Sequence, residues 1–419
     1  MYERRWTALV WPIVRGIPWE VRAAPLIFLA ASAVPRGGLA SSEGFGDHQL
    51  YRAFAEKMLA GEVPYRDFFV EYPPGALPVF LAPATAGSHY PFAFKLLMAV
   101  CGAAAIFLLG LILLRLGAGR LRLRWALAAA AFAPALFGTL AVNTYDLWPT
   151  LLVVLALFWM LAGHERLSLA SLGLATAAKL LPVLLLPLVL AHVWRTSGRR
   201  AARGALLAFL AAAGAITLPF ALLAPGGLAF SLKSQATRGL HADSLGASLL
   251  FAADRLGLYD AETAVQNPGS LNVLGTLADG VGVLASLAVV AVTVLVLRLY
   301  LGGPATAQRL ATAVAATSAA PVALGKVLSP QFLSWLIPLV PLVPGALGAV
   351  AVVLLWAALA TTIVFFLKLV TPFDLDADVW VLVLRNALLV ALLAVLVAAA
   401  RAGHRRARPV RGCEPERPS

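Results

Sequence analysis

The segments GDHQLY (residues 46–51) and PYRDFFVEYPP (residues 64–74) belong to one long connection between the first two apolar segments of the chain. From residue 46 to residue 74 this connection contains five carboxylates, six aromatic residues and a pair of adjacent prolines. Connections of this length and chemistry usually carry function rather than only joining helices. We therefore expect residues 41–90 to roof a cavity at one face of a membrane.

The composition around this connection predicts a membrane protein. Hydrophobic residues make up 61% of the 419 residues and charged residues 13%, against about 45–50% and about 25% in soluble domains. The expected fold is all-α, with about 12 transmembrane helices and interfacial helices in the first outer loop.

The net charge of +13 could indicate nucleic-acid binding, but the positions of the basic residues exclude it. They flank apolar segments, which is the positive-inside pattern of cytoplasmic loops. The basic flanks are residues 4–22, 115–124, 195–203 and 401–417. The two cysteines, Cys101 in an apolar run and Cys413 in the tail, provide neither a disulfide framework nor a thiolate metal site.

Apolar runs of about 20 residues predict the membrane spans. They cover residues 22–40, 91–115, 124–142, 147–163, 205–224, 275–299, 308–325, 331–345, 346–367 and 381–400. Residues 166–194 are too long for one span and predict a hairpin of two short helices that meet near Lys179 and Pro182. Residues 76–88 are expected to lie in the interface or to re-enter the membrane.

This arrangement predicts one transmembrane domain over residues 1–400, with the first helix retained, and a basic, disordered cytoplasmic tail over residues 401–419. Both termini are then cytoplasmic. Most polar groups outside the basic flanks face the other side. These outer segments are residues 41–90, 143–146, the turn at Lys179, 226–270, 325–331 and 368–380.

An amphipathic interfacial helix is predicted to start at Asp47 and to stop at Gly61, since apolar residues repeat at helical spacing between them. Asp47 is a good N-cap for this helix, and that could be its only role. A carboxylate held beside lipid can also have a raised pKa and act as a general base. The two roles are compatible.

Other carboxylates have a structural and a functional interpretation. Asp67 and Glu71 flank aromatic residues and end in Tyr72 and two prolines, so they suit a turn that shapes the cavity. Asp146 could cap the helix that follows it, but a carboxylate at the membrane edge is also a functional candidate. Asp374, Asp376 and Asp378 resemble a weak metal-ligand string, without the glycine spacing or closing glutamate of a calcium loop.

Cations at the outer face suit a phosphate. Lys179 and Lys326 each lie at a predicted helix break, where a lysine either faces a wet cavity or snorkels to the interface. Lys233, Arg238 and His241 form a run that could bind a phosphate or simply be a solvated loop. The sequence contains no Walker A or Rossmann glycine motif and no His-Glu-x-x-His.

Taken together, these residues resemble the GT-C superfamily of membrane glycosyltransferases, and in particular glycosyltransferase family 87, the polyprenyl-phosphate-mannose-dependent mannosyltransferases. The motifs that carry the resemblance are Gly46-Asp47 with Tyr51, Gly61-x-x-Pro64-Tyr65-x-Asp67-Phe68, Glu71-Tyr72-Pro73-Pro74, Tyr145-Asp146, Ala178-Lys179-x-x-Pro182, Arg238-Gly239-Leu240 with Asp243-Ser244, and Lys326-x-x-Ser329-Pro330-Gln331-x-x-x-Trp335.

The resemblance implies inverting transfer of a hexose, mannose in this family, from a polyprenyl-phosphate sugar to a lipid or glycan acceptor on the outer face, with no obligatory metal and no cofactor. It implies Asp47 as the catalytic base. The expected substrate and phosphate contacts are Arg238, His241, Lys179, Lys326, Asp146 and Asp243. In this family the segment at residues 238–244 usually reads Arg-Gly-Leu-Gln-x-Glu-Ser, so His241 and Asp243 depart from the pattern.

A multi-pass secondary transporter or a flippase of a lipid-linked substrate is the main alternative, because many spans and broken helices also suit a transporter. Transporters tend to have repeated halves with a binding site at the midplane. The sequence shows no such repeat, and its polar groups gather at one face. A noncatalytic scaffold would not need charges within the membrane.

Overall fold

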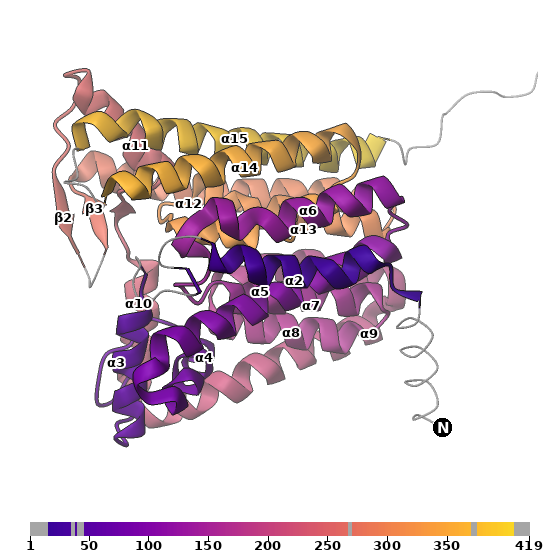
Figure 1. Ribbon diagram of the computed structural model, residues 1–419, viewed down its shortest axis with the longest axis horizontal. Helices are drawn as coiled ribbons and strands as arrows, with labels where there is room; N and C mark the ends of the chain where they lie inside the picture. The colour runs from indigo at the N-terminus through magenta and orange to yellow at the C-terminus, as the bar shows by residue number, and fades with distance from the viewer. Residues whose placement is uncertain (1–15, 35–37, 40–45, 267–269, 370–374, 406–419) are drawn as a thin grey trace, which may run out of the picture.

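The computed structural model describes residues 16–34, 38–39, 46–266, 270–369 and 375–405. In these ranges the chain is mostly helical, and long helices run side by side between two ends of the molecule (Figure 1). The α-helices are α2 (Trp19–Ala33), α3 (His48–Leu59), α4 (Leu77–Leu81), α5 (Tyr90–Arg115), α6 (Arg120–Phe137), α7 (Leu147–Leu161), α8 (Glu165–Ala178), α9 (Leu186–Leu223), α10 (Pro225–Ala236), α11 (Leu245–Arg255), α12 (Thr276–Leu301), α13 (Ala307–Leu324), α14 (Gly345–Leu369) and α15 (Leu375–Arg405). Short 3-10 helices are Pro74–Ala76, Ala82–His89, Gly138–Ala141, Leu181–Leu185, Pro330–Trp335 and Val340–Leu342.

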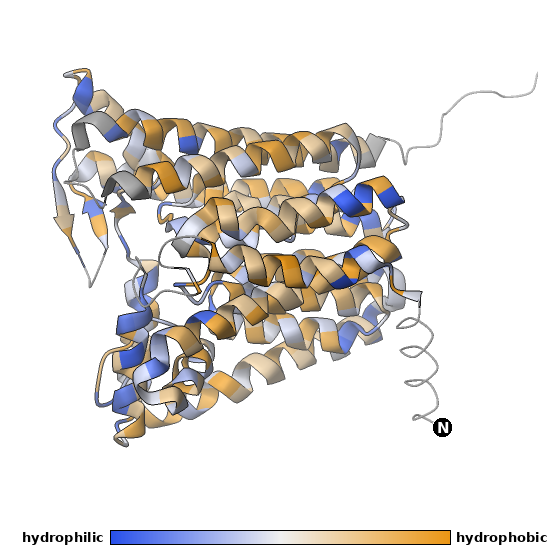
Figure 2. Cartoon of the chain, in the orientation of Figure 1, coloured by the Kyte–Doolittle hydropathy of each residue, from blue (hydrophilic) through white to orange (hydrophobic). Residues whose placement is uncertain are grey.

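The lengths and hydropathy of the helices identify a multi-pass integral membrane protein. Among the described residues, five helical segments are long and apolar enough to cross a membrane. They are Pro74–Arg115, Leu181–Leu223, Thr276–Leu301, Gly345–Phe365 and Asp378–Ala402. Figure 2 shows hydrophobic residues along the helices and hydrophilic residues gathered toward the two ends. The expected count of about 12 spans stays a prediction.

The predicted break at Lys179 is confirmed. Helix α8 ends at Ala178, Lys179 is extended (φ −153°, ψ 131°), and Pro182 opens a 3-10 turn that leads into α9. Proline has no amide hydrogen and cannot continue the bonds of a preceding helix. Within α9, Gly198 adopts φ 84° and ψ 176°, a conformation that glycine reaches without steric cost, and the chain reverses there.

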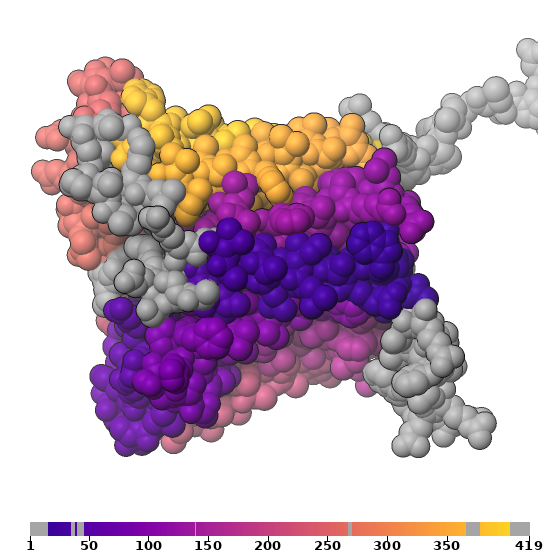
Figure 3. All heavy atoms as spheres, viewed as in Figure 1, coloured from indigo at the N-terminus to yellow at the C-terminus, as the bar shows by residue number. Residues whose placement is uncertain are grey.

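The helices pack in neighbouring pairs, with α8 along α9, α14 along α15, and α2 against both α5 and α6. Alanines are frequent on α13, which is buried along most of its length and packs against α15. Small residues let helices approach closely in a membrane. In Figure 3 the atoms of α2 and α6 and those of α14 and α15 form one continuous face.

The expectation of an all-α fold with a loop over residues 226–270 is wrong in one respect. This region contains α10, α11 and two strands, which form a three-stranded antiparallel sheet of order β1-β3-β2 with a third strand just after the region. The strands are β1 (Leu240–His241), β2 (Thr263–Val265) and β3 (Leu271–Val273). Strands of two or three residues are too short to show the alternation that identifies a strand in a sequence.

Two further boundaries differ from the prediction. The expected span at residues 331–345 consists of 3-10 turns, because Pro338 and Pro341 remove backbone donors. Helix α15 continues to Arg405, past the expected end of the membrane domain at residue 400, and the rest of the expected tail, residues 406–419, lies outside the described residues.

The two ends of the molecule differ in architecture. Helices α3 and α10 and the sheet lie at one end, on the left of Figure 1, and this end is called the loop end below. The first residues of α2 and the last residues of α15 lie at the opposite end (Figure 1). The residues predicted to bind substrate come from segments at the loop end.

Candidate active site

Asp47 occupies the position before α3, but its side chain does not cap the helix. No side-chain cap bond is made there, and the Tyr51 hydroxyl instead donates to Asp47 Oδ2 at 3.1 Å. The interpretation of Asp47 as only an N-cap is therefore wrong. Tyr51 is fully buried and stacks on Phe80 with ring centroids 4.2 Å apart, so its hydroxyl is held in place.

An aromatic cluster connects Asp47 with the next carboxylate. The ring centroid of Tyr51 lies 5.5 Å from that of Tyr72 and 5.8 Å from that of Tyr145. Tyr72 and Tyr145 are 5.2 Å apart, in an edge-on arrangement that aromatic rings favour. Three segments that are distant in the sequence thus meet, and Tyr145 places Asp146 beside them.

Asp146 forms a buried ion pair with Lys179. Lys179 Nζ lies 2.5 Å from Asp146 Oδ1, and Trp335 Nε1 donates to the same oxygen at 2.9 Å. Asp146 is only 1% exposed, and its side chain makes no cap bond to α7. The ammonium of Lys179 also lies 4.2 Å from the ring centroid of Phe332. Lys179 is therefore held inside the protein and does not snorkel to the interface.

A second ion pair joins Glu71 and Arg238. Arg238 donates to Glu71 Oε1 at 2.8 Å, and each side chain is 13% exposed. Gln235 donates to the backbone carbonyl of Glu71 at 2.8 Å, which fixes this segment against α10. The sequence assigned Glu71 to cavity shaping and Arg238 to phosphate binding, and the structure brings the two together.

Asp67 forms a local turn, one of the interpretations of the sequence. Its carboxylate accepts hydrogen bonds from the Arg66 side chain and, at 2.7 Å, from the Val63 amide. These bonds lower the pKa of Asp67 to about 2, with the Arg66 bond as the larger cause. Asp67 therefore stabilises the approach to Glu71 and Tyr72.

The segment Glu71-Tyr72-Pro73-Pro74 lies directly on the end of α8. Trp148 donates to the carbonyl of Gly75 at 3.1 Å. A Cβ at Gly75 would lie 2.5 Å from the backbone carbon of Ala177 and from the nitrogen of Ala178. Only glycine allows this approach, which places the segment beside Lys179.

The electrostatic surroundings raise the pKa of Asp47. Burial is the largest cause, and the nearby carboxylates of Asp146 and Glu71 raise the pKa further. The Tyr51 hydrogen bond and the charge of Lys179 act in the opposite direction. A carboxylate with a raised pKa is better suited to accept a proton than an ordinary aspartate.

His241 and Lys326 meet through their backbones, since the His241 amide donates to the Lys326 carbonyl at 2.9 Å. Lys326 Nζ donates to the Ala236 carbonyl at 2.9 Å and so caps the last turn of α10. His241 Nδ1 accepts the Asp243 amide at 3.2 Å. Burial is the largest cause that lowers the pKa of His241. Because Nδ1 accepts a hydrogen bond, the proton of the neutral ring is on Nε2.

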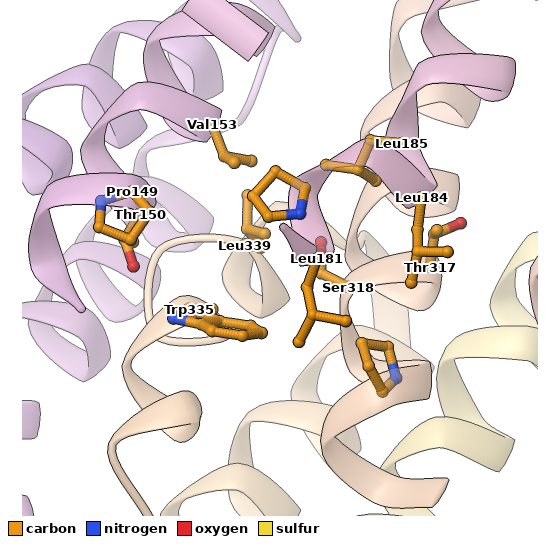
Figure 4. Close-up of a pocket in the computed structure, with 12 residues that line it drawn as sticks. Pro149, Thr150, Val153, Leu181, Leu184, Leu185, Thr317, Ser318, Trp335 and Leu339 are labelled. Atoms are coloured by element: carbon orange, nitrogen blue, oxygen red, sulfur yellow. The ribbon is translucent and has the colours of Figure 1, made fainter. Parts of the chain in front are cut away.

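An apolar cleft adjoins the Asp146–Lys179 pair. Figure 4 shows Trp335 on one side of it, together with side chains from α7, α13 and the turn after Lys179. Its lining is Pro149, Thr150, Val153, Leu181, Pro182, Leu184, Leu185, Thr317, Ser318, Pro321, Trp335 and Leu339. Trp335 both lines the cleft and donates to Asp146, so the apolar cleft and the ion pair share one side chain.

The described residues contain no group of three His, Cys, Asp or Glu side chains that could hold a metal ion. Of the aspartate string considered from the sequence, Asp374 and the side chain of Asp376 lie outside the described residues.

Sequence reasoning missed Arg385, which is fully buried on α15 and contacts the turn that carries Asp243. A signal was available, because Arg385 is the one charged residue in the apolar run 381–400. Charged residues within such runs are functional candidates.

Comparison with known proteins gives a family for the chain. The model of glycosyltransferase family 87 matches residues 69–330. Glu71, Asp146, Lys179, Arg238 and His241 lie within this range, whereas Asp47 lies before it. No curated protein sequence matches the chain significantly.

Among solved structures, the crystal structure of ArnT from Cupriavidus metallidurans bound to undecaprenyl phosphate is similar to this chain. The TM-score is 0.46 and the sequence identity 13%, over 93% of this chain and 78% of that one. At this level of similarity, the ligand of ArnT remains a property of ArnT alone.

Proposed function

The chain belongs to glycosyltransferase family 87, and we propose that it transfers a hexosyl group, specifically mannosyl, from a polyprenyl-phosphate sugar to a hydroxyl of a lipid or glycan acceptor. The reaction takes place at the loop end of the membrane domain, with Asp47 as general base. Because the chain belongs to a glycosyltransferase family, we favour this activity over the alternative of a secondary transporter or flippase.

The observation that carries this proposal is the difference between Asp47 and its neighbouring carboxylates. Asp146 is paired with Lys179 and Glu71 with Arg238. Within the described residues, Asp47 has no cationic partner and accepts a hydrogen bond only from Tyr51. An acid that is paired with a buried cation is a weak base, so of these three carboxylates Asp47 is the best able to take a proton.

The proposed reaction is a single displacement. The acceptor oxygen attacks the anomeric carbon and loses its proton to Asp47. The bond between the anomeric carbon and the phosphate oxygen breaks, and its electron pair leaves with the lipid phosphate. One base is sufficient for this route, which inverts the configuration, whereas retaining hydrolases use a nucleophile and an acid.

The surroundings of the site suit a lipid phosphate. Lys179 and Arg238 provide positive charge at the loop end, and cations favour a leaving group that gains negative charge. The cleft behind Trp335 is apolar and adjoins Lys179, so a lipid chain in the cleft would have its phosphate near these cations. His241, Lys326 and Asp243 lie around the same face, where we expect contacts with donor and acceptor.

A transfer assay with purified protein tests the proposal. Polyprenyl phosphates carrying mannose, glucose, galactose or arabinose would be offered with a panel of glycolipid acceptors, and the anomeric configuration of the product would be determined. We expect transfer from the mannosyl donor with inversion. Absence of transfer from every polyprenyl-phosphate sugar, or a product of retained configuration, would refute the proposed reaction.

The orientation in the membrane follows from the same proposal. With both termini cytoplasmic, the loop end faces outward, and a cysteine in place of Glu62 on the exposed loop should react with an impermeant thiol reagent added to intact cells. Labelling of this cysteine only after lysis would show that the orientation is the opposite of the proposed one.

A further inference from the structure

Arg385 and Asn386 form a buried polar pair on α15. Both side chains are at most 1% exposed. Arg385 Nη2 and, at 3.2 Å, Asn386 Nδ2 donate to the backbone carbonyl of Asp243. Asn386 Nδ2 also donates to Ser248 Oγ at 3.0 Å, and Asn386 Oδ1 accepts from Arg385 Nε at 3.2 Å. Two consecutive residues of one helix thus hold a single carbonyl.

That carbonyl belongs to the turn of residues 241–244, which carries His241 and the Asp243 carboxylate. The other backbone groups of the turn are tied to its surroundings. The amide of Ala242 donates to the Leu271 carbonyl and that of Ser244 to the His241 carbonyl, both at 2.9 Å. The Ser244 hydroxyl caps α11 by accepting the Ala247 amide at 3.2 Å. The contact from α15 completes the set and fixes the turn from the membrane side.

Burying a guanidinium costs more free energy than one hydrogen bond to a carbonyl returns. Removing a charge from water costs several kcal/mol even after the protein relaxes, about the largest cost of any side chain. Asn386 already supplies a neutral donor to the same oxygen. Hydrogen bonding alone therefore does not account for the charge of Arg385.

The charge of Arg385 also differs from that of the two cations paired at the site. Lys179 and Arg238 each have a carboxylate within 2.8 Å. Across the part of the chain that the structure describes, the hydrogen bonds of Arg385 go to Asp243 and Asn386 without an ion pair, and its Nη1 has no hydrogen-bond partner. The charge of Asp243 acts on Arg385, and the charge of Arg385 acts on His241.

We propose that Arg385 is a positioning residue of the transfer site, which together with Asn386 fixes the turn 241–244 and whose unneutralised charge draws the lipid phosphate to the His241 side of the site. This proposal rests on the proposed function, because the anion it serves is the phosphate of the donor. Arg385 acts through the turn and through its field, without contact with the reacting atoms. It lies outside residues 69–330, so the family match does not assign it.

Three variants separate the two parts of the role. Arg385→Gln removes the charge but keeps an amide that can donate to the Asp243 carbonyl. Arg385→Lys keeps the charge but loses the planar guanidinium. Asn386→Ala keeps the charge of Arg385 and removes one hydrogen bond to the turn. Thr312→Val serves as control, because buried Thr312 bonds only within its own helix. Each full-length protein would be purified in nanodiscs and its unfolding midpoint measured.

The probes are farnesyl phosphate and farnesol, which share an isoprenoid chain and differ in charge. Binding of each is measured by calorimetry, and donor KM and kcat by the transfer assay. We expect Arg385→Gln to weaken farnesyl phosphate binding and raise donor KM about tenfold, the size of effect that a unit charge has at roughly 12 Å in a medium of effective dielectric constant about 20. Farnesol binding should not change, and Arg385→Lys should stay within about threefold of the wild type.

Asn386→Ala should lower kcat and leave farnesyl phosphate affinity unchanged. If Arg385→Gln does not fold, Asn386→Ala still tests whether the charge of Arg385 attracts the phosphate, because it keeps that charge and weakens the hold on the turn. A loss of farnesyl phosphate affinity in Asn386→Ala would show that the turn, and not the charge, binds the anion, and would contradict the proposal.

The outcomes distinguish this proposal from the proposed function. If the wild type binds farnesol as tightly as farnesyl phosphate, the lipid-phosphate donor is wrong. If the wild type prefers farnesyl phosphate to farnesol and Arg385→Gln shows the same preference with an unchanged donor KM, the proposed role of Arg385 is wrong. A lower unfolding midpoint with unchanged binding and kinetics would make Arg385 a purely structural residue and overturn the proposal.

Discussion

Lys179 and Asp146, which come from two different helix ends, form an ion pair of 2.5 Å that is almost closed to solvent at the loop end of the molecule. The side chain of Lys179 is 14% exposed and that of Asp146 1%. Tyr145 links the pair to Tyr51 and Asp47 on one side, and Trp335 links it to the apolar cleft on the other. The pair is therefore the point at which the parts of the site meet.

Removal of one partner of this pair should be strongly destabilising. Asp146→Asn leaves Lys179 charged and buried, at a cost of about 3–5 kcal/mol. The unfolding midpoint of the purified protein should fall clearly, and the double variant Asp146→Asn with Lys179→Met should recover part of the loss. Glu56→Gln breaks an exposed pair with Arg52 and serves as control, with an expected cost of about 0–1 kcal/mol. Equal midpoints for Asp146→Asn and Glu56→Gln would contradict this prediction.

Asp47→Asn should fold and insert normally but lose sugar transfer. An amide has nearly the shape of the carboxylate but cannot accept the proton, so kcat should fall by about 10²–10⁴-fold, the usual contribution of a general base. Transfer is measured with the purified variant. Asp67→Asn, which affects only an exposed turn, should retain most activity, and Asp243→Asn tests the carboxylate of the turn 241–244. Full turnover in Asp47→Asn would exclude Asp47 as the base.

The pH dependence of transfer should report the raised pKa of Asp47. The base works only when ionised, so kcat/KM should fall as the pH drops through this pKa, at a pH above about 3.9, the ordinary value for aspartate. The Tyr51 hydrogen bond lowers the pKa. Tyr51→Phe keeps the stacked ring but removes that bond, so the acidic limb should move to higher pH. A limb that stays in place or moves down would disagree with the role of Tyr51.

Glu71 and Arg238 predict opposite effects on donor binding. Arg238→Gln removes a cation from the site and should weaken donor binding about tenfold, the usual worth of a bond with a charged group. Glu71→Gln releases Arg238 from its ion pair, so donor binding should be unchanged or tighter, although the protein loses stability. Donor affinity is measured by calorimetry. Weakening in both variants would show that Arg238 serves only to hold Glu71.

Gly75→Ala should disturb the site without a change of charge. The new methyl group would lie 2.5 Å from the backbone of α8, just before Lys179, and the resulting shift should cost about 1–3 kcal/mol. Transfer activity should fall with the unfolding midpoint. Gly280→Ala on α12 meets no atom within 4 Å and should be neutral or slightly stabilising. Full activity and an unchanged midpoint in Gly75→Ala would show that the close approach is not needed.

The sequence by itself determined the features that depend on neighbouring residues. Hydropathy over about 20 residues identified a membrane protein, helical spacing placed α3 after Asp47, and Pro182 beside Lys179 marked the helix break. The motifs of residues 44–335 identified the glycosyltransferase family, which the match over residues 69–330 confirms. The roles of the site residues stay predictions.

Only the tertiary structure decided which charges are paired. Lys179 is 33 positions from Asp146, Arg238 is 167 from Glu71, and Arg385 is 142 from Asp243. Nothing in the local sequence sets such distances, because they follow from how helices pack and where chains reverse. The packing gave Lys179 and Arg238 a carboxylate partner each and left Asp47 without a cationic partner among the described residues. It also brought the buried Arg385 to the turn beside His241.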